Sequence, residues 1–113
     1  MTALLVAAGA AAGAPLRYLV GRAFPGPRGT LLVNVAGSLL LGFLIALPAS
    51  GTALAVLGTG FCGALTTYST FSLDTLVLFE AGERRAALRN VVVSLVLGLA
   101  AAYAGLGLAA LLR

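Results

Sequence analysis

Four apolar stretches, at residues 3–21, 30–47, 53–79 and 90–112, occupy almost the whole chain. Each is close to or longer than the ~20 residues with which an α-helix crosses a ~30 Å hydrocarbon core. Of the whole sequence, 61% is hydrophobic and only 9% is charged, which lies far outside the composition of soluble globular domains. The sequence therefore predicts an all-α integral membrane protein, in which residues 1–113 form a single domain of four transmembrane helices.

The basic residues are distributed unevenly along the chain. All seven are arginines, and six of them lie around the first and third connections: Arg17, Arg22, Arg28, Arg84, Arg85 and Arg89. The second connection, residues 48–52, has none, and the opposite side holds only Arg113. The positive-inside tendency then predicts that the first and third connections are cytoplasmic and that both termini lie outside. Because these arginines form no basic face on a soluble domain, nucleic acid is not an expected partner.

Several kinds of chemistry are missing from the sequence. Cys62 is the only cysteine, so no disulfide can form within the chain, and there is no histidine. No pair of carboxylates is spaced for acid and base work, so we do not expect an enzyme. The first apolar stretch lacks the basic residues that open a signal peptide, and we expect it to be a retained helix.

The third apolar stretch contains an unusual polar run, GALTTYSTFSLDT, at residues 63–75. Six of its residues are serines or threonines: Thr66, Thr67, Ser69, Thr70, Ser72 and Thr75. In the hydrocarbon core an unpaired polar group costs several kcal/mol, so such a cluster is expected to face protein or a water-filled path and to mark a functional site.

The same stretch is also expected to break. Glycine and β-branched threonine both weaken a helix, and here they gather in the middle of a 27-residue span. We predict a break at residues 63–67, which would free backbone carbonyls and amides of the kind with which channels and transporters build ion sites. The alternative is a straight helix whose serines and threonines bond to their own carbonyls.

Two further patterns suggest surfaces that face this segment. Thr30, Asn34 and Ser38 recur every four residues and so share one helical face. Asn34 has two possible roles, either hydrogen bonding between helices or donating to a passing anion. Tyr68 and Phe71 are three residues apart, and their positively polarised ring edges suit an anion path, although aromatics at this spacing also serve simple packing.

Small residues predict close helix packing. Gly9 and Gly13 form a G-x-x-x-G pair, and Ser94, Gly98 and Ala102 make a smooth stripe at four-residue spacing on the last apolar stretch. In lipid, such stripes let helices approach closely, because packing drives their association.

Three motifs resemble the Fluc fluoride channels, also called the CrcB family: GAPLRY (13–18), GTLLVNVAG (29–37) and GFCGALTTYSTFSLDT (60–75). The resemblance covers the whole chain and implies an antiparallel, dual-topology dimer with two narrow pores and a broken third helix. It implies a structural Na⁺ at the dimer centre, held by the backbone carbonyls of Gly63 and Thr66, and a vestibule arginine at Arg17. It places the fluoride pathway on Asn34, Tyr68, Ser69, Thr70, Phe71 and Ser94.

Three positions depart from the family pattern. Tyr68 stands where phenylalanine is usual and adds a hydroxyl that either solvates fluoride or obstructs it. Asp74 replaces an expected glutamate. Gly98 offers no hydroxyl one turn beyond Ser94, at the outer part of the polar track.

The resemblance implies a fluoride-selective channel that exports F⁻ passively across the bacterial plasma membrane and so lowers its toxicity in the cytoplasm. Two rival readings are a small multidrug transporter and a non-transporting membrane assembly subunit such as a holin. The first needs an embedded carboxylate, usually in the first helix, and residues 1–21 contain no acid. A holin-like assembly subunit would not need the polar cluster that the third apolar stretch contains.

The imbalance of six arginines to one raises a further hypothesis about the partner. A dual-topology homodimer requires each chain to insert both ways, which a strong charge bias opposes. The chain would then insert mainly with its termini outside and pair with an oppositely oriented homologue. The alternative is a homodimer whose orientation is decided by assembly.

Overall fold

The computed structural model describes residues 1–48 and 50–112. All regular structure in these ranges is helical, and the elements are α1 (Thr2–Ala23), α2 (Pro27–Ala46), α3 (Gly51–Ala53), η1 (Leu54–Cys62), α4 (Gly63–Leu65), α5 (Tyr68–Glu80) and α6 (Arg84–Leu112). In the described part of the chain, α1, α2 and α6 are each long and apolar enough to cross a membrane. The prediction of an all-helical protein built from apolar helices is confirmed.

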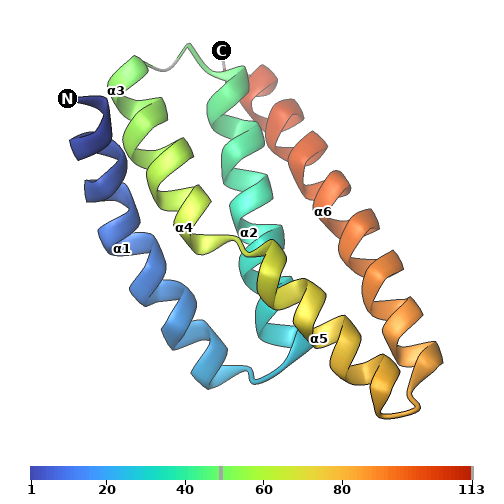
Figure 1. Ribbon diagram of the computed structural model, residues 1–113. Helices are drawn as coiled ribbons and strands as arrows, with labels where there is room; N and C mark the ends of the chain where they lie inside the picture. Colours follow the sequence, from blue (N-terminus) through green and yellow to red (C-terminus); the bar gives the residue numbers. More distant parts are fainter. Residues whose placement is uncertain (49, 113) are drawn as a thin grey trace.

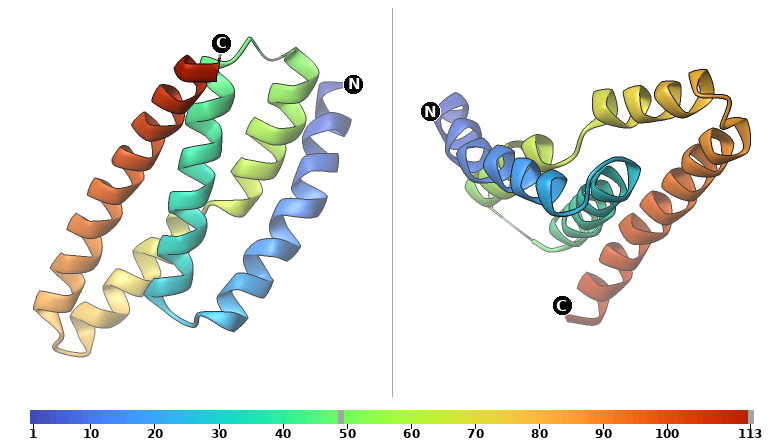
Figure 2. Two further views of the ribbon diagram at one scale, coloured as in Figure 1. Left: turned by 180° about the vertical axis from the view of Figure 1, so that it is seen from behind. Right: turned by 90° about the horizontal axis from the view of Figure 1, so that it is seen from below.

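The helices form a thin slab of about 47 × 30 × 20 Å. In Figure 1, α1, the α3–α4 segment, α2 and α6 lie side by side, and both chain ends are at the edge opposite the connections at residues 24–26 and 81–83. Seen along the bundle in Figure 2, the helices follow a curved layer and do not enclose a thick core. Most large apolar side chains are accordingly exposed on its faces, as lipid or a second protein surface requires.

The third apolar stretch is divided at two residues. Ser50 caps α3 through its side chain, and helical backbone then continues through the π-helical η1 into α4. Thr66 and Thr67 are extended, with ψ of 154° and 120°, and the helical conformation resumes only at Tyr68. The interruption lies within residues 63–67.

The two halves of this stretch pack against different neighbours. The first half, η1 and α4, lies along α1, whereas α5 lies against α6 and α2. Figure 1 shows the consequence, since the yellow α5 leaves the direction of α4 and crosses toward the orange start of α6. The interruption therefore moves the polar run from one side of the bundle to the other.

Glycines provide the close contacts between helices. Gly9 and Gly13 are buried, and a Cβ on either would collide with the backbone of η1, at Val56 and Phe61 respectively. Their predicted packing role is confirmed.

On α6 the packing stripe is displaced from the predicted one. Ala101, Gly105 and Ala109 are buried at four-residue spacing, in addition to Ala87 near the start of the helix, and a Cβ on Gly105 would collide with the Leu39 carbonyl of α2. Of the predicted stripe, Ala102 does meet α2 at Gly42, but Gly98 has nothing within 4 Å of its Cβ position. The two stripes have the same period and differ by one position, so small-residue spacing alone did not distinguish them.

Six arginines lie inside the helices, near the first and third connections around which the sequence placed them. Arg17 and Arg22 belong to α1 and Arg28 to α2. The other three lie in the first turns of α6, which begins at Arg84, six residues before the expected start. Arginine has a high helix propensity, so α6 begins at Arg84, before the apolar stretch itself begins. Arg113 lies outside the described residues.

A prediction follows from the close α2–α6 contact. Gly105→Ala should destabilise the protein by about 2 kcal/mol, because the new methyl group meets backbone that cannot rotate away. Gly107→Ala is the matched control on the same helix, since a Cβ there meets nothing within 4 Å. Thermal unfolding in detergent, followed by circular dichroism, compares the two variants. Equal stability of both variants would contradict the close-packing account.

Candidate functional site

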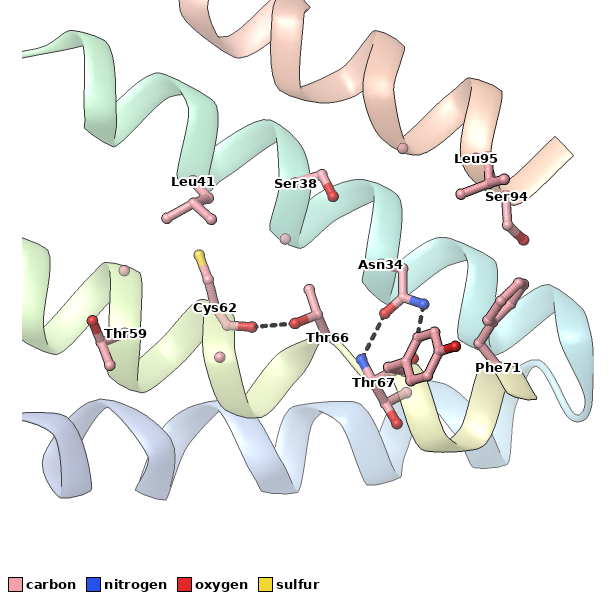
Figure 3. A pocket seen from close by; sticks show the side chains of 15 residues that line it. Asn34, Ser38, Leu41, Thr59, Cys62, Thr66, Thr67, Phe71, Ser94 and Leu95 are labelled. Atoms are coloured by element: carbon pink, nitrogen blue, oxygen red, sulfur yellow. Dashed lines mark hydrogen bonds between the residues drawn. The ribbon is translucent and has the colours of Figure 1, made fainter. Parts of the chain in front are cut away.

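The centre of the site is a reciprocal pair of hydrogen bonds between Asn34 and the backbone of Thr67. Asn34 Nδ2 donates to the Thr67 carbonyl at 3.0 Å, and the Thr67 amide donates to Asn34 Oδ1 at 2.7 Å (Figure 3). The side-chain amide thus pairs with an extended residue as a second peptide group does in a sheet. Because Thr67 is only 8% exposed, its polar backbone groups need such a partner.

This pairing withdraws two donors from the helix. In a continuous α-helix each backbone N–H donates to the carbonyl four residues earlier. The Thr67 amide donates to Asn34 instead of to the Gly63 carbonyl, and the Thr70 amide donates to Thr67 Oγ1 at 3.1 Å instead of to the Thr66 carbonyl. The carbonyls of Gly63 and Thr66 therefore lose the helical donors that a straight helix would give them.

The other side of the interruption is a capped helix start. Thr67 is the N-cap of α5, and its hydroxyl accepts from the Thr70 amide and donates to Thr70 Oγ1 at 3.0 Å. Threonine favours this position because its oxygen replaces a missing helical acceptor. The remaining amides of the first turn give this end partial positive charge, while the end of α4 presents carbonyls with partial negative charge.

Beside the interruption lies a cavity of about 600 Å³, called the central cavity below. Of the residues predicted from the sequence, it is lined by Asn34, Gly63, Thr66, Tyr68, Phe71 and Ser94. These residues come from α2, α4, α5 and α6 and from the extended pair, and Figure 3 shows Phe71 and Ser94 at the same end of the cavity. The cavity is open to the surface, since Tyr68 is 81% exposed.

The aromatic pair is arranged with its rings tilted. The ring centroids of Tyr68 and Phe71 are 6.1 Å apart at an interplanar angle of 45°. This geometry is neither stacked nor perpendicular, and the contact between the rings leaves ring edges to face other groups.

A second cavity, of about 440 Å³, is lined mainly by residues of α1, α2 and α5 and is called the vestibule below. Arg17, Thr70 and Asp74 line it, and Thr67 lines both cavities. Thr30, which is 8% exposed, donates from Oγ1 to Asp74 Oδ2 at 2.7 Å and so joins α2 to α5 in the vestibule wall. In the described part of the chain, Thr67 is the one residue that lines both cavities.

The predicted site residues are thus brought to one region but not to one cavity. Arg17 and Thr70 belong to the vestibule, and Ser69 lines neither cavity, its hydroxyl lying 3.4 Å from Thr67 Oγ1. Thr67, which lines both cavities, belongs to the polar run but was not among the residues predicted for the fluoride pathway. The preference of threonine for the start of a helix was the signal that could have identified it.

No group of three or more acidic or cysteine side chains gathers anywhere in the described ranges. A cation in this region would have to be held by neutral oxygens. The freed carbonyls of Gly63 and Thr66 are oxygens of that kind, and hard cations prefer such ligands.

Asn34 gives a testable prediction. Asn34→Ala leaves the buried amide and carbonyl of Thr67 without their partner, at a cost of about 1–3 kcal/mol. Ser38→Ala, one turn further along the same face of α2, is the matched control, because the Ser38 hydroxyl has no hydrogen-bond partner among the described residues. Unfolding in detergent should show a much larger loss for the asparagine variant. Equal losses would mean that the pair does not hold the interruption.

Comparison with known proteins identifies the family. Residues 4–106 match the model of the CrcB-like protein, Camphor Resistance (CrcB), family. The chain is 49% identical to a protein named fluoride-specific ion channel FluC 2 from Rhodococcus jostii, over 93% of this chain and 96% of that protein. It is 51% identical to the fluoride-specific ion channel FluC of Paracoccus denitrificans, over 93% and 91% of the two chains. A FluC 1 protein of Nocardia farcinica is 48% identical over 92% of this chain and 78% of its own length. With a match over nearly its full length, the chain belongs to the CrcB family of multi-pass membrane proteins.

Proposed function

We propose that this chain is a subunit of a fluoride-selective channel that lets F⁻ leave the cytoplasm passively and so limits its toxicity. Relatives at about half identity carry the name of fluoride-specific channels. The observation that carries the proposal is that Thr67 lines two cavities, in a segment flanked by hydroxyls, an amide and aromatic rings.

The chemistry of these groups suits fluoride. Fluoride is small and holds its water tightly, so a pore must replace that water with donors at close range. Asn34 uses one hydrogen of its Nδ2 group on the Thr67 carbonyl, which leaves the other for an anion in the central cavity. Ser94, Tyr68 and Phe71 line the same cavity, and a serine hydroxyl and aromatic ring edges are groups that can face an anion. None of these donors carries a fixed charge that would trap the ion.

In the vestibule, Arg17 supplies the attraction that draws an anion toward the path. Its neighbour Asp74 carries the opposite charge, but one of its oxygens is occupied by Thr30. Beyond this entrance the membrane potential, worth about 2.3 kcal/mol per charge for each 100 mV, drives an anion outward from a negative interior. Export then requires no coupled ion.

A sodium ion at the centre of the assembly belongs to the same proposal. The carbonyls of Gly63 and Thr66 fit it, because their helical donors are engaged by Asn34 and Thr67. When bound, the ion would supply positive charge next to the interruption. Gly63 is exposed and lines the central cavity, so a second subunit can reach it.

The second subunit is an oppositely oriented Fluc-type chain, in an antiparallel dimer. An open central cavity and an exposed Tyr68 support a partner that covers this face. The partner is either a copy of this chain or a homologue with the opposite charge bias. The arginines at one end of the bundle favour a single insertion direction and so favour the homologue.

The drug-transporter alternative requires an acid in the first helix, and α1 has none. Efflux of fluoride and of chloride from liposomes that contain the purified protein separates the alternatives. We expect fluoride efflux without chloride efflux. Phe71→Ile keeps the bulk of the side chain and removes the ring edge, so it should slow fluoride efflux strongly. No fluoride efflux from wild-type protein would refute the channel, and full efflux from the variant would remove the ring from the mechanism.

Sodium is tested by replacing it with N-methyl-D-glucamine on both sides of the membrane. We expect lower thermal stability and slower fluoride efflux without sodium. Thr66→Ser should respond to sodium like the wild type, because the proposed ligand is the carbonyl and not the side chain. A protein whose stability and efflux are indifferent to sodium has no such site.

Orientation is tested with a single cysteine in place of Thr2, in a Cys62→Ser background, labelled in whole cells with a membrane-impermeant maleimide. Insertion in one direction predicts labelling of essentially all copies from outside. Labelling of about half the copies, in cells that express only this chain and conduct fluoride, would instead establish the homodimer.

A further inference from the structure

The short helix α5 carries both aromatic residues of the central cavity, yet none of its residues is buried. No fully buried side chain therefore anchors α5 against its neighbours. Two adjacent residues instead join it to its neighbours by hydrogen bonds in different directions. Asp74 accepts from Thr30 on α2, and Thr75 accepts from Asn90 on α6.

The bond to α6 continues to the residue that bears the Phe71 ring. Asn90 Nδ2 donates to Thr75 Oγ1 at 2.9 Å, and Thr75 Oγ1 donates to the Phe71 carbonyl at 2.9 Å. The Thr75 hydroxyl thus uses its hydrogen on its own helix and a lone pair on α6. A two-bond chain links Asn90 to the backbone of Phe71.

The position of Asn90 indicates which part of the site these two hydrogen bonds hold in place. Asn90 precedes Ser94 by four residues, so the two lie one turn apart on the same face of α6. Ser94 and Phe71 line the same end of the central cavity (Figure 3), whereas neither Asn90 nor Thr75 lines either cavity. Asn90 therefore acts at a distance, through the register of α5 on α6.

We propose that Asn90, acting through Thr75, is a positioning residue that holds the Phe71 ring opposite Ser94 and so sets the anion selectivity of the path. Its effect on transport rests on the proposed function, whereas its effect on the position of α5 does not. Without the bond, α5 keeps its bond to α2 but loses its side-chain hydrogen bond to α6, and none of its side chains is fully buried to hold its register there. A wider gap between Phe71 and Ser94 then admits anions that keep part of their water.

The experiment compares Asn90→Leu, Thr75→Val and the double variant, which remove the bond with little change of volume. Each should lower the ratio of fluoride to chloride efflux by about three- to twentyfold, the range of interhelical hydrogen bonds in membranes. The double variant should lower this ratio no further than either single variant does, since all three remove the same hydrogen bond between Asn90 and Thr75. Thr75→Ser keeps the hydroxyl and should restore the wild-type ratio. Ser72→Ala is the control on the same helix, because its hydroxyl has no hydrogen-bond partner in the described segments.

A second measurement does not depend on transport. Hydrogen–deuterium exchange should be faster in α5 of Asn90→Leu and Thr75→Val than in wild type, with α2 unchanged. If the wild-type protein conducts no fluoride but α5 still exchanges faster in the variants, the proposed function is refuted and the positioning role is not. Wild-type selectivity in Asn90→Leu, or equal damage from Thr75→Ser and Thr75→Val, would overturn the positioning role itself.

Discussion

The Asn34–Thr67 pair is the interaction on which the rest of the structure depends. At membrane depth every backbone polar group must find a partner within the protein, so an extended residue survives only where another group replaces the helix. A side-chain amide carries one donor group and one acceptor, as a peptide does, and Asn34 offers both to the same residue. Thr67 then caps α5, and the Gly63 carbonyl is released at the other end.

The interruption also changes what the polar run can contact. Had α4 continued straight, the residues of α5 would have stayed beside α1, away from Ser94. The change of neighbour brings Phe71 to α6 and Asp74 to α2, and it leaves α5 without buried side chains. A half-helix of this kind depends on individual hydrogen bonds as well as on its half-buried contacts. These bonds are therefore the contacts through which substitutions outside the central cavity are expected to change its lining.

Sequence patterns predicted the parts that depend on local chemistry. Stretches of apolar residues identified the helices, and the four-residue spacing of Thr30, Asn34 and Ser38 identified a polar face on α2. The partners of that face were not predictable, because Thr67 and Asp74 lie 33 and 44 residues away from the residues that bind them. The π-helical winding of η1 was not predicted either. Nothing in LAVLGTGFC distinguishes five-residue from four-residue hydrogen bonding.

The charge distribution bears on how two chains can fit together. The six arginines of α1, α2 and α6 lie toward the end of the bundle that holds the connections, while the described residues of the other end have no charged side chain. In an antiparallel pair, the basic end of one subunit meets the uncharged end of the other. Each face of the membrane then receives one basic end, although each chain is strongly asymmetric. An antiparallel dimer of two copies would therefore be electrostatically balanced. Charge asymmetry therefore governs how a single chain inserts, and it places no penalty on the antiparallel dimer once both orientations are present.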